Sequence, residues 1–267
     1  MAEMTSPALQ AVALEAAAES GSEAPLTEEE GSLLATQLPW QRVRVYVWEV
    51  PVRITHWAAV ITVMILTVTG AYIADPFVVP ATDFVMQTMR FIHMVAAYVF
   101  LASGVLRTYW LFAGNEFSNW RAFIPTTRRH WAEFRGQTAW YLFLRRDLPP
   151  ILGHNALAAG TYMVIFFLFL TQTITGFALE SVHGGLAAQL WGWLPALIGI
   201  STVRIVHHLI MWVILAFMIH HVYSAIMVDH WERNGLMSSI FAGYKFVTRR
   251  DIQNARDGGM EVQERSN

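Results

Sequence analysis

The sequence contains no cysteine among its 267 residues. A disulfide, a thiolate-bound iron–sulfur cluster and the Cys-x-x-Cys-His attachment of c-type haem are therefore excluded within this chain. Any haem that the chain binds must be held non-covalently. Neutral imidazole is then the main candidate for an axial ligand of the iron, and methionine is the alternative.

Charged residues are also scarce, at 14% of the chain, whereas hydrophobic residues make up 55%. The apolar residues form blocks that are long enough to cross a bilayer. They predict an all-α membrane protein, a bundle of four transmembrane helices at about residues 54–74, 91–113, 155–179 and 203–228. A fifth stretch, Leu186 to Ile200, is short and contains Pro195. We interpret it as an interfacial or re-entrant segment.

Residues 1–39 contain no Lys or Arg but carry seven glutamates, and they lack an unbroken apolar run. This composition predicts a disordered acidic tail. We expect no cleaved signal peptide, because the basic start and the apolar centre of one are missing. The membrane domain is expected over residues 40–250, and a polar cytoplasmic tail, again disordered, over residues 251–267.

Basic residues are distributed unevenly around the predicted spans. They are numerous before the first span, between the second and third, and after the fourth, whereas the other two connections hold only Arg90 and Arg204. Lys and Arg near the ends of spans favour the cytoplasmic side. Both termini and the loop at residues 114–153 are therefore predicted to be cytoplasmic.

Two histidines of the last predicted span, His207 and His221, lie fourteen positions apart. On an α-helix this spacing is about 1400° of rotation, so both side chains return to within about 40° of one face. The other combinations of the adjacent pairs, which include His208 and His220, differ by about 120° or 220°. At about 1.5 Å rise per residue, His207 and His221 lie roughly 21 Å apart in a hydrocarbon core about 30 Å thick. Each therefore needs a partner at its own depth.

Two further histidines supply these partners, because His56 opens the first span and His93 opens the second. The second and fourth spans start on the same side of the membrane. His93 is therefore predicted to meet His207, and His56 to meet His221. We interpret the four histidines as the axial iron ligands of two bis-imidazole haem sites. The alternative for each of them is a hydrogen bond between packed helices.

An arginine stands three residues before three of these histidines, at Arg53, Arg90 and Arg204. On a helix this spacing places the guanidinium on the face of the histidine, one turn nearer the membrane surface. Haem propionates would emerge there, and arginine pairs well with carboxylates. The alternative is that the arginines are interfacial anchors, although Arg90 and Arg204 lie on the side where basic residues are scarce.

Other histidines and glycines of the chain have simpler interpretations. We expect His208 and His220 to support or pack beside the sites, and His130, His154, His183 and His230 to be surface residues. Glycines within spans allow close packing of helices, or close approach of a flat macrocycle. They are Gly70, Gly104 and Gly176.

Five short segments form a set: YVWEVPVRITHW at residues 46–57, RFIH at 90–93, GHN at 153–155, ITGFAL at 174–179 and HVYS at 221–224. Together they resemble the b-type cytochrome subunit of membrane-bound nickel–iron uptake hydrogenases, over about residues 44–247. The related membrane cytochrome subunits of formate dehydrogenases share the four-helix, two-haem plan and are the nearest alternative.

The resemblance implies a subunit of the bacterial inner membrane that binds two b haems and anchors a periplasmic hydrogenase. Its expected partners are the iron–sulfur small subunit, the nickel–iron large subunit reached through it, the lipid bilayer and membrane quinone, but no nucleic acid. The family's ligand positions fall on His56, His93, His207 and His221. Electrons would enter at His93/His207, pass to His56/His221 and reduce quinone near the cytoplasm. The chain itself would hold no hydrogenase active site and no catalytic residue.

A quinone site requires an apolar slot that opens to lipid, with a donor or a proton-exchanging group at its polar end. Near the cytoplasmic haem, the candidates are His154, Asn155, His220 and Arg53. A different class of function is a transporter whose histidines bind a metal ion or relay protons. Such proteins usually carry acidic residues inside their spans, and these spans have almost none. A bare membrane anchor is the third class.

Overall fold

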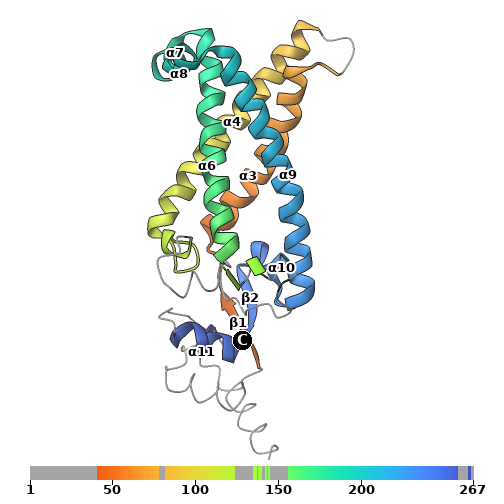
Figure 1. Ribbon diagram of the computed structural model, residues 1–267, viewed down its shortest axis with the longest axis vertical. Coiled ribbons are helices and arrows are strands. Elements are labelled where there is room, and N and C mark those ends of the chain that lie inside the picture. The colour runs from red at the N-terminus through yellow and green to blue at the C-terminus, as the bar shows by residue number, and fades with distance from the viewer. Residues whose placement is uncertain are drawn as a thin grey trace, which may run out of the picture.

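The computed structural model describes residues 41–77, 82–123, 135–136, 138–139, 142, 144, 156–257 and 264–265. Its main elements are the long helices α3 (Val50–Ala74), α4 (Asp83–Ala113), α6 (Ala156–Glu180) and α9 (Ile200–Glu232), which run side by side in Figure 1. All four are long and apolar enough to cross a membrane. The prediction of four spanning helices is confirmed.

Helices α3, α4 and α9 extend beyond the predicted spans at one end or both, whereas α6 matches its predicted span to within one residue at each end. Helix α4 starts at Asp83, and the hydroxyl of Thr82 caps it by accepting a hydrogen bond from the Val85 backbone N–H at 3.3 Å. Helix α3 has a proline in its first turn. Proline is tolerated there because the first N–H groups of a helix have no partner within the helix.

The four helices form two hairpins. Helix α3 packs along α4, and α6 packs along α9. Aromatic side chains join the hairpins: Tyr98 lies 5.3 Å from Phe177 and Phe100 lies 5.1 Å from Phe169, measured between ring centroids. Because the close packing of helices lies within each hairpin, the contact between hairpins is made by large side chains.

Two short helices, α7 (Gly185–Trp191) and α8 (Trp193–Ile198), connect α6 to α9, after the 3-10 turn η2 (Ser181–His183). They lie at the end of the bundle that is uppermost in Figure 1. Gly184 and Gly199 bound this connection with positive φ values of 86° and 81°, a region that favours glycine. We call this end of the bundle the loop end. Neither helix is a span, and the interfacial location of Leu186 to Ile200 stays a prediction.

The opposite end carries a small antiparallel sheet, which the sequence analysis did not anticipate. Strand β1 (Arg42–Tyr46) lies between β2 (Tyr244–Thr248) and β3 (Glu264–Arg265). In the register, Arg42 faces Thr248 and Tyr46 faces Tyr244. Helices α10 (Leu236–Ala242) and α11 (Arg249–Asp257) flank the sheet, and the 3-10 turn η1 (Trp120–Ala122) follows α4. We call this end the sheet end.

A hydrophobic cluster holds the sheet end together. It contains Val45, Val47, Trp48, Val52, Phe117, Val247 and Ile252. The expectation of disorder beyond residue 250 is wrong for residues 251–257, which belong to α11. The physical reason is Ile252, only 1% exposed, which packs into this cluster. The acidic segment 1–39 and most of the loop at 114–153 lie outside the described residues.

Candidate functional site

At the sheet end, His56 of α3 and His221 of α9 approach each other from different hairpins. Their ring centroids are 6.4 Å apart and the rings are inclined at 54°. An imidazole nitrogen bonds a metal ion at about 2 Å, so two imidazoles on opposite sides of one ion have centroids roughly 6 Å apart. The observed separation is therefore that of a pair with room for one metal ion between them.

Aromatic rings surround this pair. The edge of Trp57 meets the His56 ring at 5.3 Å, and Phe217 stacks on His221 at 5.5 Å. The Nδ1 atom of His56 is buried and has no hydrogen-bond partner among the described residues. An unpaired buried nitrogen is unfavourable by about 1–3 kcal/mol, and this distinguishes His56 from a histidine whose Nδ1 is hydrogen-bonded.

At the loop end, His93 of α4 and His207 of α9 form the second pair. The two imidazoles are near enough to interact electrostatically. Each has its Nδ1 next to a threonine of the neighbouring helix in its own hairpin: Thr69 Oγ1 is 2.9 Å from Nδ1 of His93, and Thr175 Oγ1 is 3.0 Å from Nδ1 of His207. The same arrangement therefore occurs in both hairpins.

The direction of these hydrogen bonds follows from the second bond of each threonine. Thr69 donates its hydroxyl proton to the carbonyl of Ile65, and Thr175 to that of Thr171, both at 2.7 Å. A hydroxyl has one proton, so each threonine oxygen must accept from the imidazole. The network thus assigns the proton to Nδ1 and leaves the lone pair on Nε2, the tautomer in which histidine binds a metal.

A glycine follows each of these threonines and gives the imidazole room. A Cβ atom at Gly70 would lie 3.2 Å from Cε1 of His93, and one at Gly176 would lie 3.1 Å from Cε1 of His207. Both distances are tighter than ordinary contacts, so the rings lie against bare backbone. Gly104 differs, because a Cβ atom there would meet nothing within 4 Å.

Each hairpin therefore carries Thr-Gly on its first helix and Arg-x-x-His on its second. The Arg-x-x-His steps and the glycines were predicted from the sequence, whereas the threonines were missed. The sequence does contain a signal for these threonines, because the same dipeptide occurs twice. Thr69-Gly70 lies on the span before Arg90, and Thr175-Gly176 lies on the span before Arg204. Gln172 was missed as well; its Nε2 lies 3.3 Å from Nε2 of His207, and its Oε1 is buried without a partner among the described residues.

The neighbouring histidines lie elsewhere. His208 meets the edge of Trp212 at 6.2 Å, and His220 lies 3.3 Å from the Ser224 hydroxyl, one turn further along α9. Both side chains are exposed, as that of His221 is, so their contacts and not their exposure distinguish them. The structure therefore brings His207 and His221, rather than their neighbours, to the partners expected from the helical face.

The other predicted site residues have varied surroundings. Arg90 and Arg204 are exposed at the loop end, one turn from His93 and His207. Arg53 donates a hydrogen bond from Nη1 to the carbonyl of Phe241 in α10. The quinone candidates His154 and Asn155 lie outside the described residues. Within the part of the chain that the structure describes, no three His, Cys, Asp or Glu side chains cluster as a bare metal ion would require.

Residues 47–243 match the model of a protein family described as prokaryotic cytochrome b561. The chain belongs to this family. A relative named "Probable Ni/Fe-hydrogenase B-type cytochrome subunit" from Cupriavidus necator is 38% identical over 213 residues, which cover 75% of this chain and 86% of the relative. Relatives of the same name are 36% identical in Rhodobacter capsulatus, with 77% and 82% covered, and, as the hydrogenase 1 subunit, 33% identical in Escherichia coli K12, with 75% and 90% covered.

The chain is therefore an integral membrane cytochrome of b type, and the cofactor that its family implies is haem b. The residues fit this group. The rings of His56 and His221 lie 6.4 Å apart between the hairpins, and Gly70 and Gly176 leave space beside the rings of His93 and His207. The absence of cysteine agrees with non-covalent binding.

Proposed function

We propose that the chain is a di-haem cytochrome b subunit that anchors a nickel–iron hydrogenase and passes electrons from hydrogen to membrane quinone. The observation that carries the proposal is the presence of two histidine pairs, one at each end of the bundle, each formed between different hairpins. The names of the relatives support the hydrogenase as the electron donor.

The axial ligands are His93 with His207 at the loop end, and His56 with His221 at the sheet end. Each haem, when bound, supplies an iron centre that accepts and releases one electron. Arg90 and Arg204 are suited to hold propionates at the loop end, because a guanidinium pairs with a carboxylate in two parallel hydrogen bonds. The chain has no cysteine that could hold a thiolate-bound metal centre, and we assign the oxidation of hydrogen to the partner.

Hydrogen bonding to the ligands differs between the two ends. Thr69 and Thr175 accept from Nδ1–H of the loop-end histidines, and such a bond makes an imidazole a stronger electron donor to its metal. Nδ1 of His56 has no such partner among the described residues. We therefore expect the lower reduction potential at the loop end, so that electrons move from the loop end to the sheet end with a loss of free energy.

The orientation follows from the basic residues of the sheet end, which include Arg42, Arg44, Lys245, Arg249 and Arg250. The positive-inside rule directs this end, with both termini, to the cytoplasm, and the loop end to the periplasm of an inner membrane. Oxidation of one hydrogen molecule on the periplasmic side releases two electrons and two protons. One quinone takes up two electrons and two protons to become quinol.

Two alternative functions would require other substrates or other residues. A formate dehydrogenase subunit would use the same four histidines with formate as the electron source. A transporter for metal ions or protons would need acidic residues along the spans, whereas α3 carries none and α4, α6 and α9 carry them only near their ends. The sequence relationship favours hydrogenase over formate dehydrogenase.

The number of haems tests the proposal. A pyridine haemochrome assay on quantified protein is expected to give two haems per chain, and acid acetone is expected to extract both because neither is covalently attached. A fully occupied preparation with one haem or none would contradict the two-site arrangement.

A further inference from the structure

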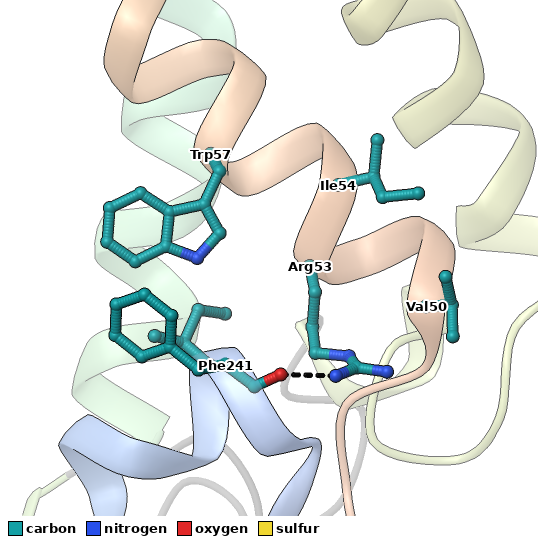
Figure 2. Close-up of a pocket in the computed structure, with 6 residues that line it drawn as sticks. Val50, Arg53, Ile54, Trp57 and Phe241 are labelled. Atoms are coloured by element: carbon teal, nitrogen blue, oxygen red, sulfur yellow. Dashed lines mark hydrogen bonds between the residues drawn. The ribbon is translucent and has the colours of Figure 1, made fainter.

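A pocket of about 430 Å³ opens at the sheet end between helices α3 and α10 (Figure 2). Its lining residues are Val50, Arg53, Ile54, Trp57, Ile240 and Phe241. The volume lies in the range of pockets that bind small organic molecules. None of the four paired histidines lines the pocket.

The wall of the pocket is mainly apolar. Val50 and Ile54, on the outer face of α3, are 49% and 59% exposed. Because this face of a spanning helix contacts lipid, a hydrophobic molecule can reach the pocket from the bilayer. The pocket is therefore open to a ligand that is itself dissolved in the membrane.

Two N–H groups in the lining lack hydrogen-bond acceptors. The Nε atom of Arg53 and the Nε1 atom of Trp57 are buried and have no partner among the described residues. Figure 2 shows the indole nitrogen and the guanidinium on the side of α3 that faces α10. Unpaired donors beside an apolar pocket favour a ligand that brings an acceptor oxygen, because pairing them recovers free energy lost on burial.

The charge of the pocket selects between two kinds of membrane ligand. Clusters of cations favour an anionic lipid headgroup, whereas Arg53 is the one cationic side chain among the described residues of the lining, and it already donates to the carbonyl of Phe241. A neutral ring with carbonyl oxygens needs hydrogen-bond donors and an apolar wall, and the pocket offers both.

The pocket is also next to the sheet-end histidine pair. The Trp57 ring lies 4.6 Å from the Phe241 ring on one side and 5.3 Å from the His56 ring on the other. A ring bound in the pocket is therefore separated from His56 by one aromatic side chain.

We propose that this pocket binds the headgroup of membrane quinone, with Trp57 and Arg53 donating hydrogen bonds to a carbonyl oxygen. The inference rests on the proposed function, since it supplies the quinone site of that electron path. Of the two roles expected for Arg53 from the sequence, this inference selects the quinone site. The haem propionates would then be bound by other residues. A small movement of either side chain would present its N–H to the ligand.

The test uses the complete hydrogenase complex in membranes, with hydrogen as donor and decylubiquinone or a short-chain menaquinone as acceptor. Ile54→Trp fills the pocket, and Trp57→Phe removes one N–H while it keeps the ring. We expect KM for the quinone to rise about tenfold in each variant, while hydrogen still reduces the haems.

Ile61→Trp is the matched control, because Ile61 is 57% exposed on the same helix and does not line the pocket. Should Ile54→Trp lose haem through misfolding, Ile240→Trp fills the pocket from α10.

The outcomes separate this inference from the proposed function. If hydrogen fails to reduce the haems of the unaltered complex, the proposed function is wrong and the inference falls with it. If hydrogen reduces the haems but the pocket variants have the KM of Ile61→Trp, the inference alone is overturned. It is also overturned if filling the pocket releases a bound phospholipid, detected by mass spectrometry, without changing KM.

Discussion

Single hydrogen bonds distinguish the two ends of the bundle. At the loop end, a threonine of the adjacent helix accepts from Nδ1–H of each histidine, and passes its own proton to a carbonyl one turn earlier. This short chain fixes the orientation of the ring as well as its tautomer. At the sheet end, the ring of His56 is oriented by its contact with Trp57 instead.

The threonine bonds predict a change in reduction potential. Thr175→Val keeps the shape of the side chain but removes the acceptor, so His207 becomes a weaker donor to the iron and the potential of the loop-end haem rises. A hydrogen bond of about 1 kcal/mol corresponds to roughly 40 mV for a one-electron couple. A redox titration of the two haems by absorbance measures the shift. Thr175→Ser, which retains a hydroxyl, is the control and should keep the original potential; equal potentials for Val and Ser would refute this role.

Histidine identity gives a second prediction at this scale. His207→Ala and His221→Ala are each expected to lose one of the two proposed haems, because each removes a proposed axial ligand. His208→Ala and His220→Ala are the matched controls and are expected to keep both, since their side chains contact Trp212 and Ser224 of α9 itself. Haem content per chain measures the result. Loss of haem from His208→Ala together with full haem in His207→Ala would show that the ligand assignment is wrong.

Among the elements, Glu49 joins three parts of the sheet end. Its Oε2 atom accepts hydrogen bonds from Trp110 Nε1 and the Asn115 backbone N–H, both at 2.8 Å, and from the Ser118 hydroxyl at 3.0 Å. Glu49 precedes α3, whereas Trp110 belongs to α4 and the other two donors follow it. One carboxylate therefore connects the start of the first hairpin helix to the end of the second.

Removal of this carboxylate should destabilise the sheet end. Glu49→Ala leaves three partly buried donors without their acceptor, and we expect a loss of about 2–4 kcal/mol in the free energy of unfolding. Thermal unfolding of the purified subunit in detergent, followed by circular dichroism, measures the change. Glu49→Gln keeps an acceptor oxygen and should fall between Ala and the unaltered chain. If Ala and Gln variants melt together with the unaltered chain, the connection contributes nothing to stability.

The helices and the histidine faces could be predicted from the sequence because both depend on local periodicity. The sheet could not, although the alternation of Arg42, Val43, Arg44 and Val45 is typical of a half-buried strand. Its partner, β2, lies about two hundred residues further along the chain, and a short strand is stable only against that partner. The threonine and glutamine contacts of the histidines were missed for a similar reason, since each comes from a different helix.

In the whole molecule, the two hairpins repeat one constellation at the loop end, with Thr-Gly on the first helix and Arg-x-x-His on the second. The sheet end has no such repeat, because His56 lies on the first helix of one hairpin and His221 on the second helix of the other. The loop end is thus built alike from both hairpins, whereas the sheet end is asymmetric and carries the pocket beside His56. This arrangement agrees with an entry point for electrons at one end and an exchangeable acceptor at the other.

The direction of electron flow gives the last prediction. Hydrogen is expected to reduce both haems only in membranes that also contain the hydrogenase, because the proposed function places the activation of hydrogen in that partner. His93→Ala should stop the reduction of quinone by hydrogen, yet leave hydrogen oxidation with a soluble artificial acceptor largely intact, since that acceptor takes electrons before they reach this subunit. Absorbance of the b haems, recorded after hydrogen and formate are supplied separately, decides between the two related functions. Reduction by formate alone would assign the chain to a formate dehydrogenase, whereas reduction by hydrogen alone requires that the loop end receives electrons from a hydrogenase.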